Sequence, residues 1–345
     1  MWEQSLTTLV ELDGQHRFSE CPDYQAIMPA LRSGNITNEI RNKLNTRVVD
    51  GINVKLPTAH DCKYASYHNY VRSSINAQVF RRYLKTHHAD ATENFIPMGA
   101  VVIKSKAEWK AAKRDFYNSE RKILYEKISE ADVKDTWSGR ADPFLCLFHH
   151  CHVMCCSNEN VSGGVANGTT ALFEGICLKE GRTTHPIQVD GMWVHAVDVD
   201  DIEYMKLRWY DCKFTGSFQL KPTRRLFKVM YPVQMGDKTK KVPTSVYLTC
   251  FAINLNTATT GFKLQGSTVE YIVIAQWSKV KNFAYVLLSR CRKLAGLFLL
   301  EPLPTDINFV PEAKYSSMMS KLRSKIATVP LSFENMMSYF QSEGH

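Results

Sequence analysis

Short β-type segments crowd the middle of this chain, and the run lies between two stretches in which strands alternate with helices. Closely spaced short strands are typical of a small barrel, whereas alternating strands and helices are typical of a parallel α/β sheet. The sequence therefore predicts an α/β domain interrupted by a small all-β barrel over about residues 176–244. The segments behind this prediction are Met192–Val199, Glu203–Trp209, Phe214–Leu220 and Leu226–Val233.

Outside the barrel, hydrophobic periodicity predicts the other elements. Apolar residues at helical spacing predict two short helices on either side of Gly34, and Thr37 is suited to cap the second. A strand and loop over residues 53–66 then precede a helix over about 67–86. We also predict a charged, solvated helical insertion over about 104–135, one continuous apolar strand over 144–156, and an amphipathic helix over 312–325.

The charge balance favours a polyanionic partner. Lys and Arg number 43 and Asp and Glu 34, which gives a formal net charge of +9. This is a weak indication of nucleic-acid binding, since many basic proteins bind nothing anionic. The ten cysteines follow no disulfide framework spacing, and neither a signal peptide nor a membrane-spanning run is visible. We therefore expect reduced thiols, an intracellular protein and no membrane partner.

A cluster of cysteines and histidines over residues 146–156 suggests a zinc site as one hypothesis. Structural zinc usually takes two pairs of ligands separated by a loop. Ligands that alternate along one strand point to opposite faces, and free cysteine is also a common core residue. We therefore predict no metal site from this group, which comprises Cys146, His149, His150, Cys151, His152, Cys155 and Cys156.

Two runs near the carboxyl end have residue types suited to phosphate chemistry. The first, ATTGFKLQGST over residues 258–268, is a polar glycine-containing turn after a predicted strand, which can aim backbone N–H groups at phosphate. The second, YVLLSRCR over 285–292, places Arg290 at the end of a neighbouring predicted strand, where an arginine can stabilise a transferring phosphoryl group. Each run alone would be an ordinary turn or surface arginine, and their order and spacing make the pair informative.

These runs resemble motifs V and VI of superfamily-one DNA helicases of the Pif and RecD-like group. The first resembles T-x-H-K-x-Q-G-x-T, and the second resembles V-A-L-S-R-x-R followed by a G-L strand. Phe262 departs from the pattern, because the family usually has histidine there. The matching residues are Thr260, Lys263, Gln265, Gly266, Thr268, Ser289, Arg290, Arg292, Gly296 and Leu297.

Three upstream segments resemble the same family in the same order. Residues 12–17 with 31–34 resemble motif IV and the helix after it, with Arg17 at the nucleotide-sensing position. Residues 64–69 with Arg72 and Asn76 resemble the strand end that meets single-stranded DNA. Residues 153–158 with the N-G-T turn at 167–169 resemble the strand and turn that lead into an inserted barrel. The resemblance spans about residues 6–310 and extends to the helicase part of Helitron-type elements.

The resemblance implies a second RecA-like motor domain with a Src-homology-three-like barrel inserted into it. Residues 1–175 and 245–310 would form the motor domain, 176–244 the barrel and 311–345 a helical tail. It implies a 5′–3′ helicase, nuclear or organellar if eukaryotic, that acts in DNA repair or recombination. Arg17 and Arg290 would be catalytic and, with Gly266 and Arg292, nucleotide-binding, whereas single-stranded DNA would be contacted by Asn69, Arg72, Lys263, Gln265 and Thr268.

The nucleotide-gripping motifs of such a motor are not among these 345 residues. A G-x-x-x-x-G-K-[ST] loop is needed to hold the phosphates, and an acidic pair to hold the metal. Residues 162–169, SGGVANGT, have the glycines without the lysine, and the acidic run at 197–201 is interpreted as a solvated hairpin. We therefore expect ATP and Mg²⁺ to bind only with a first RecA-like domain, in cis or in trans, and the chain alone to lack ATPase activity.

Two other interpretations remain open. The chain could be a non-catalytic or degenerate nucleic-acid-binding module, which the missing phosphate loop favours. It could also be an unrelated basic α/β protein, which would make five ordered motif matches accidental.

Overall fold

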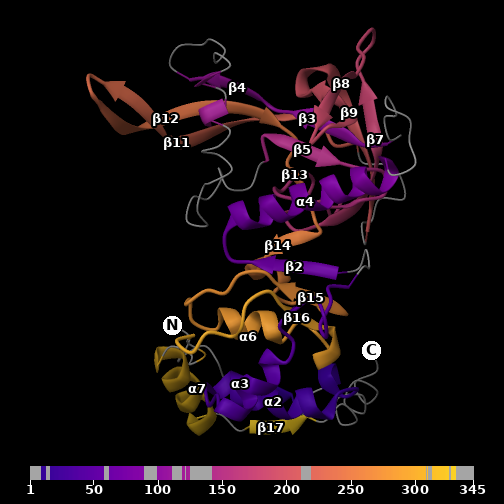
Figure 1. Ribbon diagram of the computed structural model, residues 1–345. Coiled ribbons are helices and arrows are strands. Elements are labelled where there is room, and N and C mark those ends of the chain that lie inside the picture. Colours follow the sequence, from indigo (N-terminus) through magenta and orange to yellow (C-terminus); the bar gives the residue numbers. More distant parts are fainter. Residues whose placement is uncertain are drawn as a thin grey trace, which may run out of the picture. The chain divides into compact units, whose positions relative to one another are not determined.

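The computed structural model describes residues 9–12, 16–57, 62–88, 99–110, 119–120, 122–124, 142–210, 219–307, 309, 313–325 and 328–331. The chain divides into two compact units, which we call unit 1 (Met1–Asp61 with Leu264–His345) and unit 2 (Cys62–Lys263). The architecture is mixed α/β, with both parallel and antiparallel strand pairs (Figure 1). No described helix is long and apolar enough to cross a membrane.

Unit 2 is built on two four-stranded sheets that share one hydrophobic core. Phe173 and Val153 of the first sheet and Val194 and Ile103 of the second are all buried in this core. The first sheet has the order β10 (Ile202–Trp209), β7 (Thr170–Leu178), β6 (His152–Cys155), β13 (Ile253–Leu255). The second has the order β5 (Phe144–Leu147), β3 (Val101–Lys104), β9 (Met192–Asp198), β8 (His185–Val189).

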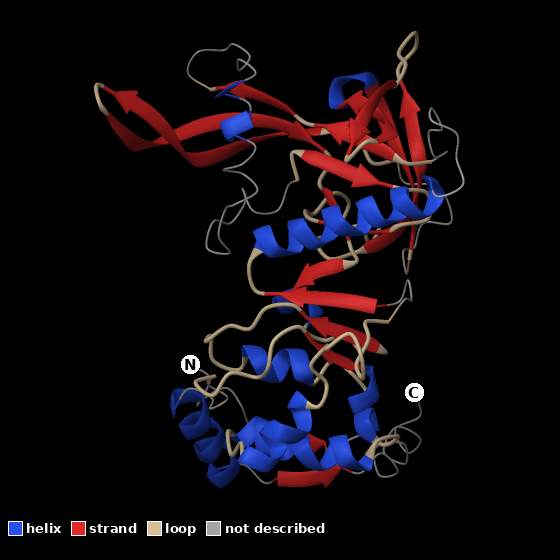
Figure 2. Cartoon of the chain, in the orientation of Figure 1, coloured by secondary structure: helices blue, strands red, loops and turns tan. Residues whose placement is uncertain are grey.

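A long hairpin extends from these sheets (Figure 2). It consists of β11 (Thr223–Met235) and β12 (Lys238–Cys250), and β4 (Lys106–Trp109) pairs with the base of β12. A second buried cluster forms here from Leu124, Tyr231, Val246 and Leu248. The prediction of a solvated helical insertion over 104–135 is therefore wrong at its start, because residues 106–109 form a strand. Residues 119–120 and 122–124 are helical as predicted, but Leu124 is buried rather than solvated. Residues 111–118, 121 and 125–135 lie outside the described part of the chain.

Two further predictions in unit 2 are wrong. The apolar run at 144–156 is two strands, because His150 adopts a left-handed conformation with φ of 62° and redirects the chain from one sheet to the other. The acidic run at 197–201 is no hairpin, because β9 and β10 belong to different sheets. It forms a 3-10 turn, η3 (Val199–Asp201), with Val199 buried and Asp200 paired to Lys106 at 2.9 Å.

The inserted barrel and the domain boundaries remain predictions. The segments expected at 192–199, 203–209 and 226–233 are confirmed as strands, whereas 214–218 lie outside the described residues. Strands within 176–244 pair with β3 and β4 outside that range.

A parallel strand pair and a long helix complete unit 2. β2 (Cys62–Ser66) pairs in parallel with β14 (Ala258–Thr260), in a register that places Ser66 opposite Thr260. The chain then enters α4 (Asn69–His88), which buries Phe80 and Leu84 in the core. Asn76 of α4 donates to Leu255 O at 2.7 Å and accepts from Ala258 N at 2.8 Å. These bonds fix the backbone that leads into β14.

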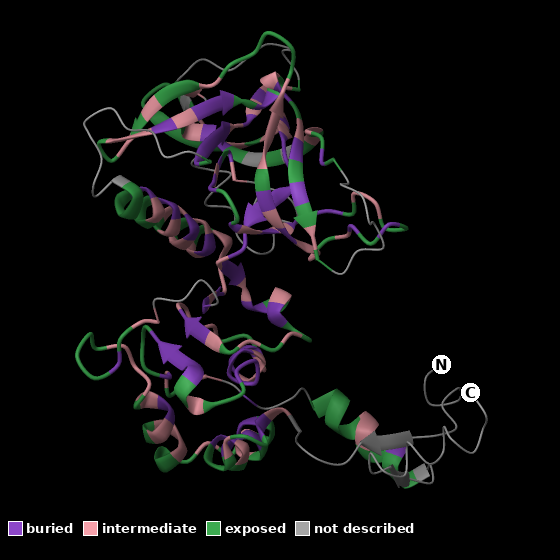
Figure 3. Ribbon diagram, turned by 90° about the vertical axis from the view of Figure 1, so that its right-hand side faces the viewer, coloured by how far each residue is buried: buried purple, intermediate pink, exposed green. Residues whose placement is uncertain are grey.

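Unit 1 contains the two predicted amino-terminal helices, α2 (Pro22–Ser33) and α3 (Asn38–Asn45). Both predicted signals are confirmed: Gly34 ends α2 in a left-handed conformation, and the Thr37 side chain accepts from Ile40 N at 3.2 Å. The parallel strands β15 (Tyr271–Ile274) and β16 (Leu297–Leu299) are buried almost throughout (Figure 3). The other elements of this unit are β1 (Leu9–Leu12), η1 (His16–Phe18), α6 (Phe283–Leu288), η5 (Leu294–Gly296), α7 (Ala313–Lys325) and β17 (Thr328–Leu331). The short helix η4 (Gly261–Leu264) follows β14 of unit 2.

Candidate functional site

Two arginines that are far apart in the sequence meet in unit 1. Arg17 lies in η1, and its Nη1 donates to Ser289 O at 2.8 Å. Arg290 is the next residue and is only 9% exposed. Its guanidinium donates to Val286 O at 2.8 Å, Ser289 Oγ at 2.6 Å and Ser267 O at 3.3 Å. Backbone carbonyls and one serine hydroxyl therefore hold both guanidinium groups in place.

The electrostatics of this arginine pair favour an anion. Burial lowers the pKa of Arg290, and the neighbouring positive charge of Arg17 lowers it further. Within the described part of the chain, neither arginine forms an ion pair with a carboxylate. Two adjacent cations without a counter-charge raise the local potential, and guanidinium groups bind phosphate oxygens well. The arrangement is thus chemically suited to a phosphate group.

The predicted position of Arg290 at a strand end is wrong. Arg290 follows the helix α6, because residues 283–288 form a helix rather than a strand. Open α/β sheets usually place their ligands at the carboxyl ends of the parallel strands. Arg290 O instead accepts from Val269 N at 3.0 Å, just before β15 begins, so the pair lies at the amino end of that strand.

Tyr24 supports the arginine pair and was not anticipated in this role. Its side chain is fully buried, and its hydroxyl donates to Leu288 O, the end of α6, at 2.6 Å. Phe18, next to Arg17, packs edge-on against Tyr24, with the two ring centroids 5.6 Å apart. Tyr24 therefore joins the backbone that carries Arg17 to the backbone that carries Arg290. Its place in a helical apolar pattern indicated only a core residue.

The other predicted residues of unit 1 lie on or beside an exposed turn. Gln265 and Gly266 are exposed, and Gly266 has φ of 88°, a conformation that favours glycine. Thr268 and Arg292 line one pocket together with Glu20 and Lys293, which form an ion pair at 2.7 Å. The structure therefore brings Arg17 to Arg290 and Thr268 to Arg292.

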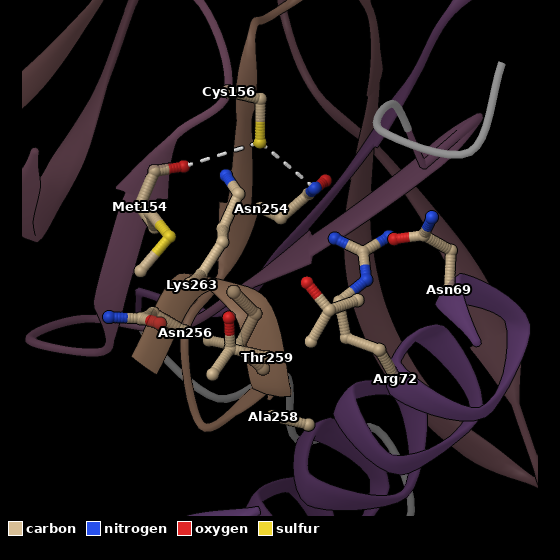
Figure 4. Close-up of a pocket in the computed structure, with 11 residues that line it drawn as sticks. Asn69, Arg72, Met154, Cys156, Asn254, Asn256, Ala258, Thr259 and Lys263 are labelled. Atoms are coloured by element: carbon tan, nitrogen blue, oxygen red, sulfur yellow. Dashed lines mark hydrogen bonds between the residues drawn. The ribbon is translucent and has the colours of Figure 1, made fainter. Parts of the chain in front are cut away.

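A polar pocket in unit 2 contains the remaining three predicted residues, Asn69, Arg72 and Lys263 (Figure 4). They come from the amino end of α4 and from η4, which follow the carboxyl ends of β2 and β14. The site therefore lies where open α/β sheets place their ligands. The rest of the lining comprises Met154, Cys156, Asn254, Leu255, Asn256, Ala258, Thr259 and Thr260.

The contacts around this pocket leave polar atoms available to a ligand. Lys263 Nζ donates to Asn167 Oδ1 of the N-G-T turn at 3.0 Å. Arg72 Nη2 donates to Asp142 at 3.2 Å and to Ser73 Oγ at 2.9 Å. In the described residues, the buried Arg72 Nε and Asn256 Oδ1 have no hydrogen-bond partner. Buried polar groups are normally satisfied, so one donor and one acceptor remain for a polar ligand.

Sequence reasoning did not identify Asp142, Asn254 and Asn256. Asn254 Nδ2 donates to Cys156 Sγ at 3.1 Å, as Figure 4 shows. Asn254 lies in β13 and Asn256 directly follows the strand, so the two asparagines are two positions apart. Side chains at this spacing share one face of a strand, which is a pattern that the sequence shows. Asp142 lies 70 positions from Arg72 and gave no local signal.

Among the described residues, no three or more His, Cys, Asp or Glu side chains come close enough together to hold a metal ion, and this includes the cysteines and histidines of 146–156. Zinc binds thiolates, and burial opposes their formation here. It raises the pKa of Cys151 to about 12 and that of Cys155 to about 11. The nine cysteines in the described residues are free thiols.

Neither a protein-family model nor a curated protein sequence matches this chain. Solved structures do match its fold. A Pif1 helicase from Bacteroides in complex with ADP-AlF3 and ssDNA has a TM-score of 0.54 and 17% identity, with 90% of this chain and 55% of that chain covered. A Bacteroides Pif1 bound to ssDNA has a TM-score of 0.52 and 16% identity, with 90% of this chain and 55% of that chain covered.

A Pif1 helicase from Candida albicans gives a TM-score of 0.51 and 16% identity, with 89% of this chain and 59% of that chain covered. The chain therefore spans little more than half the length of these proteins. At such low identity the likeness concerns the fold. Nearly the whole of this chain has a fold similar to that of the corresponding part of Pif1 helicases.

Proposed function

We propose that this chain is the second RecA-like part of an ATP-dependent 5′–3′ DNA helicase, which couples nucleotide state to movement along single-stranded DNA. ATP and Mg²⁺ would be held mainly by a first motor domain, in cis or in trans. The similar Bacteroides helicase was crystallised with ADP-AlF3 and ssDNA, which supports both ligand classes. The inserted segment 176–244 would be the Src-homology-three-like barrel of this group.

The observation that carries the proposal is the meeting of Arg17 and Arg290. Arg17 donates to the carbonyl oxygen of Ser289, which is 272 positions away in the sequence, and Arg290 is the residue after Ser289. An arginine pair held by carbonyl oxygens, with no carboxylate among the described residues neutralising it, can stabilise the charge of a phosphoryl group presented by another domain. Arg292 and Gly266 would contribute to the same nucleotide-facing surface.

Asn69, Arg72 and Lys263 would contact the DNA backbone, with Gln265 and Thr268 on the following turn. Their shared pocket supports this assignment for the first three. Contacts of this kind are independent of base sequence, as a translocating motor requires.

The isolated chain is expected to have no ATPase activity, with or without DNA, because it contains no phosphate-gripping lysine motif. Phosphate release with poly(dT) present is the measurement. Arg290→Ala provides the control, because residual phosphate release from a contaminant would be unchanged in this variant. DNA-stimulated hydrolysis that the wild-type chain performs and Arg290→Ala abolishes would contradict the half-motor assignment.

Binding to single-stranded DNA is expected to be weak and to fall about tenfold or more between 50 and 200 mM salt, assuming about three phosphate contacts. Fluorescence anisotropy with a labelled oligo(dT) measures the affinity at each salt concentration. Lys263→Gln should flatten the salt dependence by about one phosphate contact, whereas Lys85→Gln, an exposed lysine on α4, should leave it unchanged. A salt-independent affinity would argue against backbone contacts.

The second candidate function is a non-catalytic nucleic-acid-binding module. The departure from the helicase pattern at Phe262 favours it. Such a module would bind DNA as above and would confer no ATPase activity when mixed with a P-loop domain of the same group, whereas the proposed half-motor would.

A further inference from the structure

Four aromatic rings form a continuous row in unit 2, next to the polar pocket. Phe262 and Tyr67 have ring centroids 5.9 Å apart, and Tyr67 and His68 have centroids 4.8 Å apart. His68 and Tyr70 then lie nearly parallel, at 5.3 Å and 24°. We call these four residues the aromatic row.

The strand register explains why residues so far apart in the sequence meet here. Ser66 and Thr260 are paired at the carboxyl ends of β2 and β14. Tyr67 follows Ser66 directly, and Phe262 follows Thr260 by two residues, so both rings emerge at the same sheet edge. Tyr70 lies in the first turn of α4. The row therefore shares its edge with Asn69, Arg72 and Lys263.

The two ends of the row face solvent. Tyr70 is 46% exposed and Phe262 is 44% exposed, whereas most large apolar side chains of this unit are buried. Exposed aromatic rings beside cationic side chains are suited to single-stranded nucleic acid. Its unpaired bases can stack on the rings, and its phosphates can pair with the cations.

We propose that the aromatic row is a stacking platform for the bases of single-stranded DNA, with Phe262 and Tyr70 as its main contacts. This inference rests on the proposed function and goes beyond it, because it assigns base contacts in addition to backbone contacts. It also gives the departure at Phe262 a chemical meaning: a phenyl ring presents an apolar face where the helicase pattern has an imidazole. The platform tolerates any base sequence, since every base has a π-face.

The test compares oligo(dT) with an abasic oligonucleotide of equal length and charge, in an anisotropy assay with the full chain. The wild-type chain should bind oligo(dT) about five- to tenfold more tightly, and Phe262→Ala and Tyr70→Ala should each reduce this ratio severalfold. Phe262→Trp should preserve it. A 2-aminopurine base in the oligonucleotide should be quenched by wild type and less by Phe262→Ala.

Tyr315→Ala is the matched control. Tyr315 is also an exposed aromatic, at 53%, and it lies beside Lys314, but it belongs to α7 in unit 1. This variant should keep the wild-type ratio. Equal affinity of the wild-type chain for oligo(dT) and the abasic strand would overturn the platform, and the backbone contacts of the proposed function would stand. Binding to neither strand would overturn both.

Discussion

Methionine in place of Arg72 is expected to lower the free energy of unfolding by about 3–5 kcal/mol. The Arg72 and Asp142 side chains are only 7% and 15% exposed and lie 3.2 Å apart. Removing the guanidinium leaves the Asp142 carboxylate largely out of water without its counter-charge, and the remaining bond from Ser73 Oγ at 2.6 Å cannot neutralise it. Urea unfolding followed by circular dichroism measures the effect.

The same helix offers a matched control. Arg81 of α4 also forms an ion pair, with Asp190 at 3.0 Å, but both side chains are about half exposed. Arg81→Met should therefore cost less than about 1 kcal/mol. The double variant Arg72→Met with Asp142→Asn should recover a large part of the loss, because it removes the uncompensated charge as well. Equal losses for Arg72→Met and Arg81→Met would show that burial of the first pair is not what matters.

This ion pair limits the contacts that Arg72 could make with DNA in the proposed function. Its Nη2 is already bonded to Asp142 and Ser73, so this nitrogen is not free to bind a ligand in the pocket. Loss of DNA binding in an Arg72 variant would therefore mix a lost contact with a damaged fold. Lys263 is the cleaner probe, because its bond to the neutral Asn167 can be broken without leaving a buried charge.

Local signals made the helices of unit 1 predictable. The apolar spacing of α2, the left-handed Gly34 and the Thr37 cap all act within one or two turns of chain. The meeting of Arg17 and Arg290 has no local signal and followed from the resemblance alone. The helix before Arg290 was missed because residues 283–288 are almost uniformly apolar, and periodicity cannot separate a short buried helix from a strand in such a run.

The break within residues 144–156 could not be predicted from polarity. Phe148 and Cys151 flank the turn and are buried like the strands on either side, so that hydrophobicity does not fall where the chain changes sheet. The chain turns at His150, which has positive φ. Few residues other than glycine adopt this conformation, and histidine does so more often than most, but one histidine in an apolar run does not predict it. Similarly, the acidic run at 197–201 looks like a solvated turn, yet Val199 is buried where the chain crosses between sheets.

The pocket in unit 2 was predicted in part. Asn69, Arg72 and Lys263 were named from the motifs, and the parallel register of β2 and β14 brings them together. Asp142 was not predictable, because it follows a highly charged stretch and its partner is chosen by tertiary packing. The aromatic row depends on the same register, which a list of motif residues does not contain.

Replacing Gly296 with alanine is expected to lower the free energy of unfolding by about 3 kcal/mol, more than an ordinary surface change. A Cβ at this position would lie 2.1 Å from Glu270 O and 2.7 Å from Cys291 Sγ. The carbonyl cannot retreat freely, because Glu270 directly precedes β15, whose Ile272 is paired with Leu297. The clash must therefore separate the two strands or shift their register, and the turn that carries Arg290 would move with them. Gly51→Ala is the control in the same unit: its φ of 77° is unfavourable, but no atom lies within 4 Å of the added Cβ. It should cost only about 1 kcal/mol. Thermal and urea unfolding of both variants measure the difference. A Gly296→Ala protein as stable as Gly51→Ala would mean that the Glu270 carbonyl can move away from position 296 without separating the two strands.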